Sequence, residues 1–109
     1  MAEVGKIRIK LPQTIKKDEV VSVKALVMHP METGLRKDKA GKPIPAHYIN
    51  DVKVYYGNDL ISSMEWTTAV SADPFITFYV KADKAAPLKI VYKDNKGGTY
   101  EDTVQVNPQ

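Results

Sequence analysis

The chain has 109 residues, 43% of them hydrophobic and 27% charged, so it is long enough for one globular domain with one core and too short for two. It contains no cysteine, which excludes a disulfide, a thiolate metal ligand and a thiol nucleophile within these residues. The net charge of +3 results from 16 basic and 13 acidic residues scattered along the chain, a pattern that argues against nucleic-acid binding. We expect a single domain over residues 1–109.

Neither a targeting segment nor a membrane span is predicted. The N-terminal stretch MAEVGKIRIKLP lacks the apolar run of a secretory signal, and no run of about 18 apolar residues occurs in the chain. We therefore expect no membrane partner, and from the residues alone we expect a cytoplasmic protein.

Seven segments alternate apolar and polar residues with the period of two that is typical of β-strands. They are residues 6–11, 19–28, 51–56, 60–66, 75–82, 88–92 and 100–106. The second segment becomes apolar on both faces at Leu26 and Met28, so we expect the loop that follows to cover its end. Residues 75–82 are the densest in β-forming residues and are predicted to be a central strand, whereas the weaker pattern of 60–66 suits a sheet edge.

Short strands, frequent turn signals and the absence of a helical period favour an all-β fold, an immunoglobulin-like antiparallel β-sandwich of about seven strands. A barrel of five or six strands is the alternative. The predicted core consists of the apolar side chains on one face of each strand, namely Ile7, Ile9, Leu11, Val21, Val23, Ala25, Val27, Val52, Val54, Tyr56, Ile76, Phe78, Val80, Ala82, Leu88, Ile90, Tyr92, Tyr100, Val104 and Val106.

Residues 29–50 form a long polar stretch between two predicted strands. Pro30, Pro43 and Pro45 each fix φ and restrict the preceding residue, so the stretch is predicted to be a stiffened loop. Four basic residues against two acidic ones give residues 30–46 a local charge of +2; they are Arg36, Lys37, Lys39 and Lys42 with Glu32 and Asp38. We consider two interpretations, a solvated loop and a surface whose charge speeds association with an acidic partner.

No constellation of catalytic residues is recognisable. Only His29 and His47 are available as a histidine base, and neither lies in a motif typical of hydrolases, metalloproteases or nucleotide-binding proteins. The carboxylates are scattered, so no pair of them stands out as a general acid and base. We predict that the chain is not an enzyme, and we assign no catalytic residue, cofactor or metal ligand.

One motif suggests a metal nevertheless. In Met28-His29-Pro30-Met31, thioether sulfur and imidazole are ligands that suit Cu(I). A small copper-binding β-sandwich that uses His29 and Met31, with His47 as a further ligand, is therefore the alternative function. The structural interpretation, which we favour, places Met28 in the core, has His29 hydrogen-bonded to loop backbone, and packs Met31 beneath the loop.

Several motifs resemble those of the SoxZ family, subunits of the bacterial sulfur-oxidation carrier complex SoxYZ. The matching stretches are residues 29–34 (HPMETG), 36–38, 41–45, 48–50, 71–75 and the turn 94–100, so the resemblance extends over nearly the whole chain. It implies an immunoglobulin-like β-sandwich that forms a heterodimer with SoxY. In that family the C-terminal cysteine of SoxY carries the covalently bound sulfur intermediates of thiosulfate oxidation.

The resemblance also implies what this chain does. It would be a non-catalytic subunit that pairs with and presents SoxY, and it would meet sulfur-oxidising enzymes through the complex. The lack of a thiol agrees with this role, because the chain cannot itself carry sulfur by thiolate chemistry. The family works in the periplasm, so we expect export together with a signal-bearing SoxY. Candidate residues for binding SoxY are His29, Met31, Glu32, Arg36, Lys39 and Tyr48.

Overall fold

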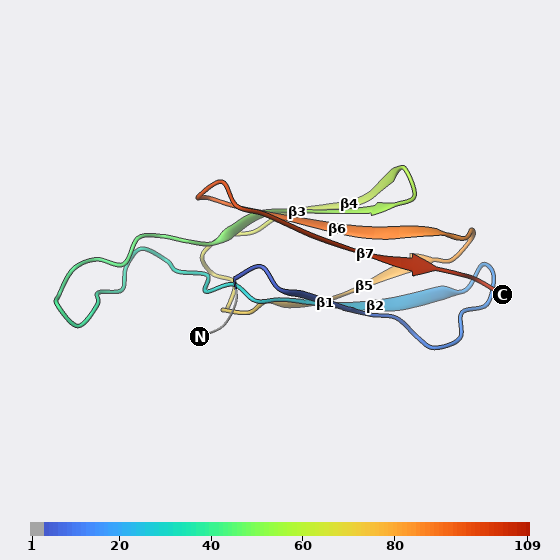
Figure 1. Cartoon of the computed structure of the whole chain (residues 1–109), viewed down its shortest axis with the longest axis horizontal. Coiled ribbons are helices and arrows are strands. Elements are labelled where there is room, and N and C mark those ends of the chain that lie inside the picture. Colours follow the sequence, from blue (N-terminus) through green and yellow to red (C-terminus); the bar gives the residue numbers. More distant parts are fainter. Residues whose placement is uncertain (1–3) are drawn as a thin grey trace.

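The computed structural model describes residues 4–109, which form seven β-strands joined by loops (Figure 1). The strands are β1 (Ile7–Lys10), β2 (Val20–Val27), β3 (Ile49–Tyr56), β4 (Asp59–Glu65), β5 (Phe75–Lys81), β6 (Ala86–Asp94) and β7 (Thr99–Val106). The predicted all-β class is confirmed, and each predicted segment overlaps one strand. Within residues 4–109, no helix is long and apolar enough to cross a membrane.

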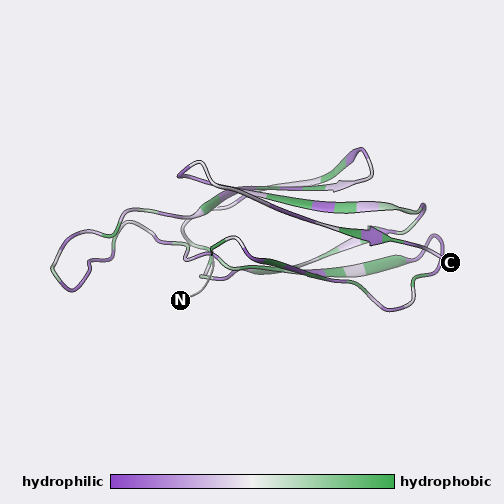
Figure 2. Ribbon diagram, in the orientation of Figure 1, coloured by the Kyte–Doolittle hydropathy of each residue, from purple (hydrophilic) through white to green (hydrophobic). Residues whose placement is uncertain are grey.

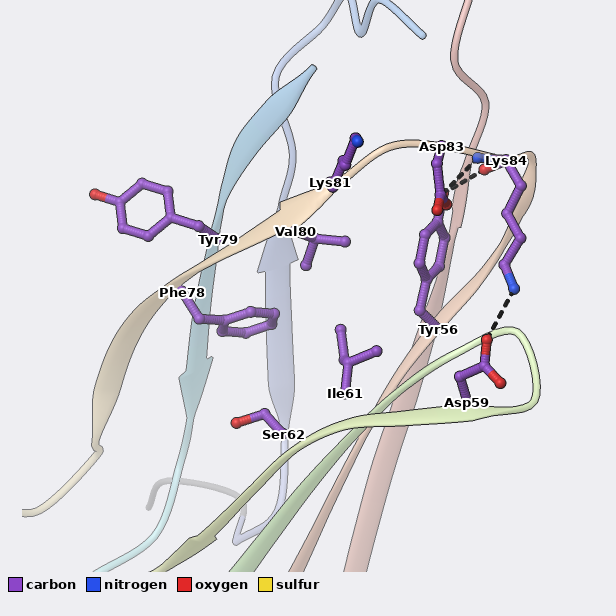
Figure 3. Close-up of a pocket in the computed structure, with 10 residues that line it drawn as sticks. All are labelled: Tyr56, Asp59, Ile61, Ser62, Phe78, Tyr79, Val80, Lys81, Asp83 and Lys84. Carbon is purple, nitrogen blue, oxygen red and sulfur yellow. Dashed lines mark hydrogen bonds and ion pairs between the residues drawn. The ribbon is translucent and has the colours of Figure 1, made fainter. Parts of the chain in front are cut away.

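The strands form two antiparallel sheets that face one another as a sandwich. One sheet has the order β1-β2-β5 and the other β4-β3-β6-β7. On one side the edge strands β1 and β7 lie beside each other, and on the other side β4 and β5 flank a cavity of about 330 Å³ (Figure 3). The predicted sandwich is confirmed, and the barrel alternative is wrong because the two sheets do not join into one closed sheet.

The core lies between the sheets because alternate residues of each strand point inward. The side chains of Val23, Val54, Leu88 and Ile90 are fully buried, and Figure 2 shows the alternation as green and purple bands along the strands. Each such burial contributes about 1.5–3 kcal/mol. The predicted core is confirmed, with several members near the sheet edges half-buried: Ile7, Ile9, Leu11, Ile76, Phe78, Tyr100 and Val104.

Strand β5 is not central. It pairs only with β2 and forms one edge of the three-stranded sheet, so the prediction from its density of β-forming residues was wrong. The prediction failed because Phe75 and Tyr79 make both faces of β5 apolar, a pattern typical of a strand covered on both sides. In the structure these two side chains point outward and are exposed. Strand β4, predicted at an edge, does lie at one.

The long polar segment leaves the sandwich altogether. Residues 30–46, which we call the extension, project beyond the ends of both sheets along the long axis of the molecule (Figure 1). The extension does not fold back over Leu26, whose side chain stays half-buried on the outer face of β2. The expectation that this loop covers the end of β2 was therefore wrong.

Candidate functional site

The extension is a narrow ribbon whose two legs are joined by two isolated β-bridges, Glu32 with His47 and Lys37 with Pro43. Near its base, Glu32 and His47 exchange both backbone hydrogen bonds, at 2.7 and 3.0 Å. Further out, the Ile44 N–H donates to the Arg36 carbonyl at 2.8 Å. The prolines predicted to stiffen this segment lie within the ribbon, where their fixed φ angles reduce the freedom that folding must remove.

The tip of the extension is a tight turn organised by Asp38. Its Oδ1 accepts hydrogen bonds from the backbone N–H groups of Ala40 and Lys42, at 2.9 and 3.0 Å. Gly41 takes a φ of 80°, which glycine adopts at little cost. The turn therefore presents its cations on a defined scaffold.

A cluster of polar side chains holds the base of the extension, and Asp94 is its centre. Asp94 ends β6, and its Oδ1 accepts hydrogen bonds from the backbone N–H groups of Lys96 and Gly98, at 3.0 and 2.7 Å. These bonds close the β6–β7 turn and orient the carboxylate. Gly98 is required there, because a Cβ at this position would lie 2.7 Å from Asp94 Oδ2.

The other carboxylate oxygen joins three elements. Asp94 Oδ2 lies 3.1 Å from Nε2 of His29, 2.8 Å from Nε2 of His47 and 2.7 Å from the hydroxyl of Tyr100. Because a carboxylate can only accept, both imidazoles and the hydroxyl must donate. His29 precedes the extension and His47 follows it, so one buried carboxylate fastens both of its legs. We call His29, His47, Asp94 and Tyr100 the clamp.

Backbone contacts around the clamp reinforce it. The Met31 N–H donates to Nδ1 of His29 at 3.3 Å, and the His29 N–H donates to Asp73 Oδ1 at 3.0 Å. On the returning leg, the side chain of Asn95 accepts from the Tyr48 N–H and donates to the carbonyl of Ala46, each at 2.9 Å. The β6–β7 turn thus binds main chain as well as side chains of the extension.

Burial and charge set the ionisation of the clamp. Burial lowers the pKa of His29 below its usual 6.5, and the neighbouring His47 lowers this pKa further, although Asp94 opposes both effects. Burial alone would raise the pKa of Asp94, but hydrogen bonds from Tyr100, His29, the Gly98 N–H and His47 hold it far below its usual value. Burial and the bond to Asp94 raise the pKa of Tyr100 to about 12. At neutral pH Asp94 is therefore a carboxylate, and His29 and Tyr100 are neutral donors to it.

The clamp also has the composition of a metal site. One ligand atom from each of His29, His47 and Asp94 lies within 4.8 Å of the other two, and two imidazoles with a carboxylate suit several divalent metals. The hydrogen bonds oppose this use. Because Met31 donates to Nδ1 of His29, the proton of that imidazole is on Nε2, the nitrogen that faces Asp94 and that a metal would need. We therefore interpret the clamp as a hydrogen-bonded structural site.

Copper ligation by Met31 finds no support either. The Sδ atom of Met31 accepts a hydrogen bond from the Ile49 N–H at 3.3 Å, and the side chain is buried as part of the hydrophobic core. His29 interacts with loop backbone, as the structural interpretation of the motif requires. Met28 is half-buried just after β2 and is not part of the core, so this part of the structural interpretation was wrong. The motif that suggested Cu(I) instead anchors the extension.

A family comparison identifies the chain. The model of the family described as sulphur oxidation protein SoxZ matches residues 7–105, which is nearly the whole chain. The chain belongs to the SoxZ family. It is thus a protein of sulfur oxidation, as the motifs in and around the extension predicted. None of the curated proteins compared with it gives a match.

Solved structures with the same fold include proteins of different activity. A superoxide reductase (neelaredoxin) from Ignicoccus hospitalis is 19% identical with a TM-score of 0.71, covering 97% of this SoxZ-family chain and 82% of its own. One from Archaeoglobus fulgidus is 19% identical with a TM-score of 0.64, covering 94% and 88%. The sulfur carrier protein SoxY from Chlorobium limicola f thiosulfatophilum is 16% identical with a TM-score of 0.60, covering 93% and 73%. At such identities these likenesses show the fold alone.

The structure divides the predicted partner-binding residues of this SoxZ-family chain into three groups by their exposure. His29 and Met31 are buried, so in this fold they position the extension and offer no surface. Arg36 and Lys39 are exposed on the extension, while Glu32 and Tyr48 are half-buried at its base. Glu32 also pairs with Arg36, whose Nε lies 2.9 Å from the Glu32 carboxylate.

Asp94, Asn95 and Tyr100 were not predicted to be site residues, because residues 94–100 were recognised only as a turn and Tyr100 only as a core residue. Asp94 lies 65 residues from His29 along the chain, and no spacing rule joins them. Locally, the sequence shows only an aspartate at the start of a turn that contains two glycines. This pattern predicts the hydrogen bonds of Asp94 Oδ1 to the turn backbone, but not those of Asp94 Oδ2 to distant side chains.

Two tyrosine-to-phenylalanine substitutions form a matched pair that tests how much the clamp contributes to stability. Tyr100→Phe removes a donor to Asp94 and should lower the free energy of unfolding by about 1–2 kcal/mol. The hydroxyl of Tyr92 is buried and has no partner within residues 4–109, so Tyr92→Phe should leave stability unchanged or raise it by about 1 kcal/mol. Urea denaturation of both variants measures the difference. Equal destabilisation by the two would contradict the special role of the clamp.

Proposed function

We propose that this chain is the non-catalytic subunit of a sulfur carrier complex. It pairs with and presents a SoxY subunit whose C-terminal cysteine carries the sulfur intermediates of thiosulfate oxidation. The observation that carries the proposal is the family match over residues 7–105 of a chain that has no cysteine. Without a thiol these residues cannot hold sulfur by thiolate chemistry, so a partner must do so.

The extension supports a role in pairing. It projects from the sandwich, and Leu35 on it is 87% exposed. An isolated two-stranded ribbon is at best marginally stable in water, so the buried clamp at its base keeps it ordered. Joining β2 to β3 needs no such device. We therefore assign the extension to partner binding, with Arg36 and Lys39 as the exposed candidate residues.

The proposal includes a place of action, the periplasm. The chain would be exported as a folded pair with signal-bearing SoxY, and sulfur-oxidising enzymes would act on the pair. Cell fractionation tests this: the chain should enter the periplasm only when SoxY with its export signal is co-expressed. Export that is independent of SoxY would contradict the proposed route.

A charge reversal tests the role of the extension. Lys39→Glu combined with Lys42→Glu should lower the association rate with SoxY about tenfold at low salt, and the effect should shrink as salt screens the charges. Both lysines are exposed near the tip. Arg36 is left unchanged, because reversing its charge would also break its ion pair with Glu32. Surface plasmon resonance with immobilised SoxY measures the rate.

The matched control is Lys16→Glu with Lys17→Glu, which changes the net charge equally. These exposed residues lie in the connection between β1 and β2, at the end of the molecule opposite the extension (Figure 1). The control should alter the association rate much less than the extension variant. If both variants lowered the association rate equally, only net charge would matter. If neither variant changed the rate, the extension would not belong to the pairing surface.

A further inference from the structure

The outer face of the three-stranded sheet exposes several large apolar side chains. Val20, Phe75 and Tyr79 are 63%, 60% and 70% exposed. The register places Phe75 beside Leu26 of β2, and in Figure 3 the ring of Tyr79 points away from Val80 and from the opposite sheet. A strand apolar on both faces is typical of one that is covered on both, and nothing within residues 4–109 covers this face of β5.

Every charged side chain on this face is basic. Arg8 and Lys10 on β1, Lys24 on β2 and Lys81 on β5 are exposed, and the pairing of the strands places them on the same side as Phe75. The three strands contain no acidic residue. We call the outward side chains of β1, β2 and β5 the basic sheet face.

The outer face of the other sheet differs. Its charged residues are balanced, three acidic and three basic: Asp51, Glu65 and Glu101 with Lys53, Lys89 and Lys93. A balanced face has no net charge to attract an acidic surface, whereas four cations without a carboxylate do attract one. The two faces of the sandwich are therefore not equivalent as docking surfaces.

A shallow hollow lies in the basic sheet face. It has a volume of about 140 Å³ and is lined by Lys10, Leu11, Pro12, Ser22 and Lys24. Leu11 and Pro12 contribute apolar surface to this lining, and Lys10 and Lys24 contribute positive charge. Such a hollow suits an apolar side chain flanked by carboxylates, which matches the apolar centre and polar rim of a protein interface.

We propose that the basic sheet face is the docking surface for the SoxY subunit, and that the covering surface of SoxY carries carboxylates around an apolar centre. This inference rests on the proposed function and adds where the partner sits. A second copy of this chain is not the occupant, because a symmetric contact through this face would bring the same four cations against each other.

The basic sheet face and the extension then have separate tasks in the same association. Exposed charges on a projecting ribbon act mainly on the association rate, whereas apolar anchors that lose their water on binding act mainly on the dissociation rate. A stable pair buries about 800 Å² on each partner, so a partner bound to this face can extend its contacts to the extension as well. The extension projects beyond the ends of both sheets, including the sheet that carries this face (Figure 1).

Dissociation kinetics of the pair test the inference. Phe75→Ser with Tyr79→Ser should raise the dissociation rate from immobilised SoxY at least about tenfold, and should leave the association rate within about twofold. Lys24→Glu, as a separate variant, should also weaken the pair, because it places a carboxylate on the face that receives carboxylates. All three side chains are exposed, so thermal unfolding should show folded proteins.

The controls carry the same types of change on the other sheet. Leu60→Ser removes an exposed apolar side chain from β4, and Lys89→Glu reverses a charge on the outer face of β6. Neither should change the dissociation rate by more than about twofold. Because Lys24→Glu does not touch the apolar side chains, it remains informative if the double serine variant proves unstable.

The outcomes separate this inference from the function on which it rests. If the wild-type chain binds SoxY, the face variants bind it equally well and the control variants bind it less tightly, then SoxY lies on the other sheet. That result would overturn the inference alone. A wild-type chain that forms no complex with SoxY, or that forms a dimer through the basic sheet face instead, would overturn the inference and the proposed function together.

Discussion

Replacing Asp94 by alanine should lower the free energy of unfolding by about 3–5 kcal/mol. The change leaves the buried imidazole of His29, the half-buried imidazole of His47, the hydroxyl of Tyr100 and two backbone N–H groups without their shared acceptor. The loss is large because the side chain of Asp94 is fully buried, so water cannot readily replace the carboxylate. Urea denaturation followed by circular dichroism measures it.

The matched control is Glu101→Ala on β7, whose side chain is exposed. It removes the same charge and should change stability by less than about 0.5 kcal/mol. Limited proteolysis gives an independent reading, because loss of the clamp should make residues 30–46 more sensitive to cleavage in the folded protein. A variant at Asp94 that keeps both its stability and its resistance to protease would show that the extension is held by other contacts.

Acid should destabilise the protein in two stages. The folded-state pKa of His29 is lowered, so below about pH 6.5 the unfolded chain binds a proton that the folded chain does not. The contribution of His29 to the free energy of unfolding is therefore complete above pH 6.5. It is lost as the pH falls toward the pKa of His29 in the folded protein. The pKa of Asp94 is also lowered, so its contribution persists down to about pH 3.8, the unfolded value, and declines below it.

In each stage the free energy of unfolding should change with pH by at most about 1.4 kcal/mol per pH unit, the value for the uptake of one proton. Thermal unfolding across pH 7.5 to 4.5 resolves the first stage. His29→Gln keeps an amide donor that can reach Asp94 but has no group that titrates in this range, so its stability should depend less on pH there. If the variant retained the full pH dependence of the wild type, another group would be responsible.

The clamp connects the fold to the proposed function. A basic extension can contribute to partner association only if it stays ordered, and the clamp fastens both of its legs to the end of the β6–β7 hairpin. Because the anchors are hydrogen bonds to a buried carboxylate, they are specific in direction as well as strong. Variants of the clamp should therefore affect pairing indirectly, through the order of the extension.

Alternation along the chain was enough to predict the seven strands and most of the core, because a residue in a strand points to one face or the other according to its position alone. The family was also readable from local motifs such as residues 29–34. The same local character explains the failure at β5. A run with Phe75 and Tyr79 on one face and Ile76 and Phe78 on the other indicates two apolar faces, but it contains no information about which neighbour covers each.

Local alternation and composition were thus sufficient to predict the all-β class, the inward faces of the strands, the long proline-containing loop and the lack of a thiol, since each of these depends on neighbouring residues or on composition. The fold added three features that they could not predict: β5 lies at an edge, Asp94 joins His29 to His47, and the cations of three strands share one exposed face. These features depend on strand order and on contacts between residues far apart in the chain. Sheet topology sets such contacts, and no local period encodes them.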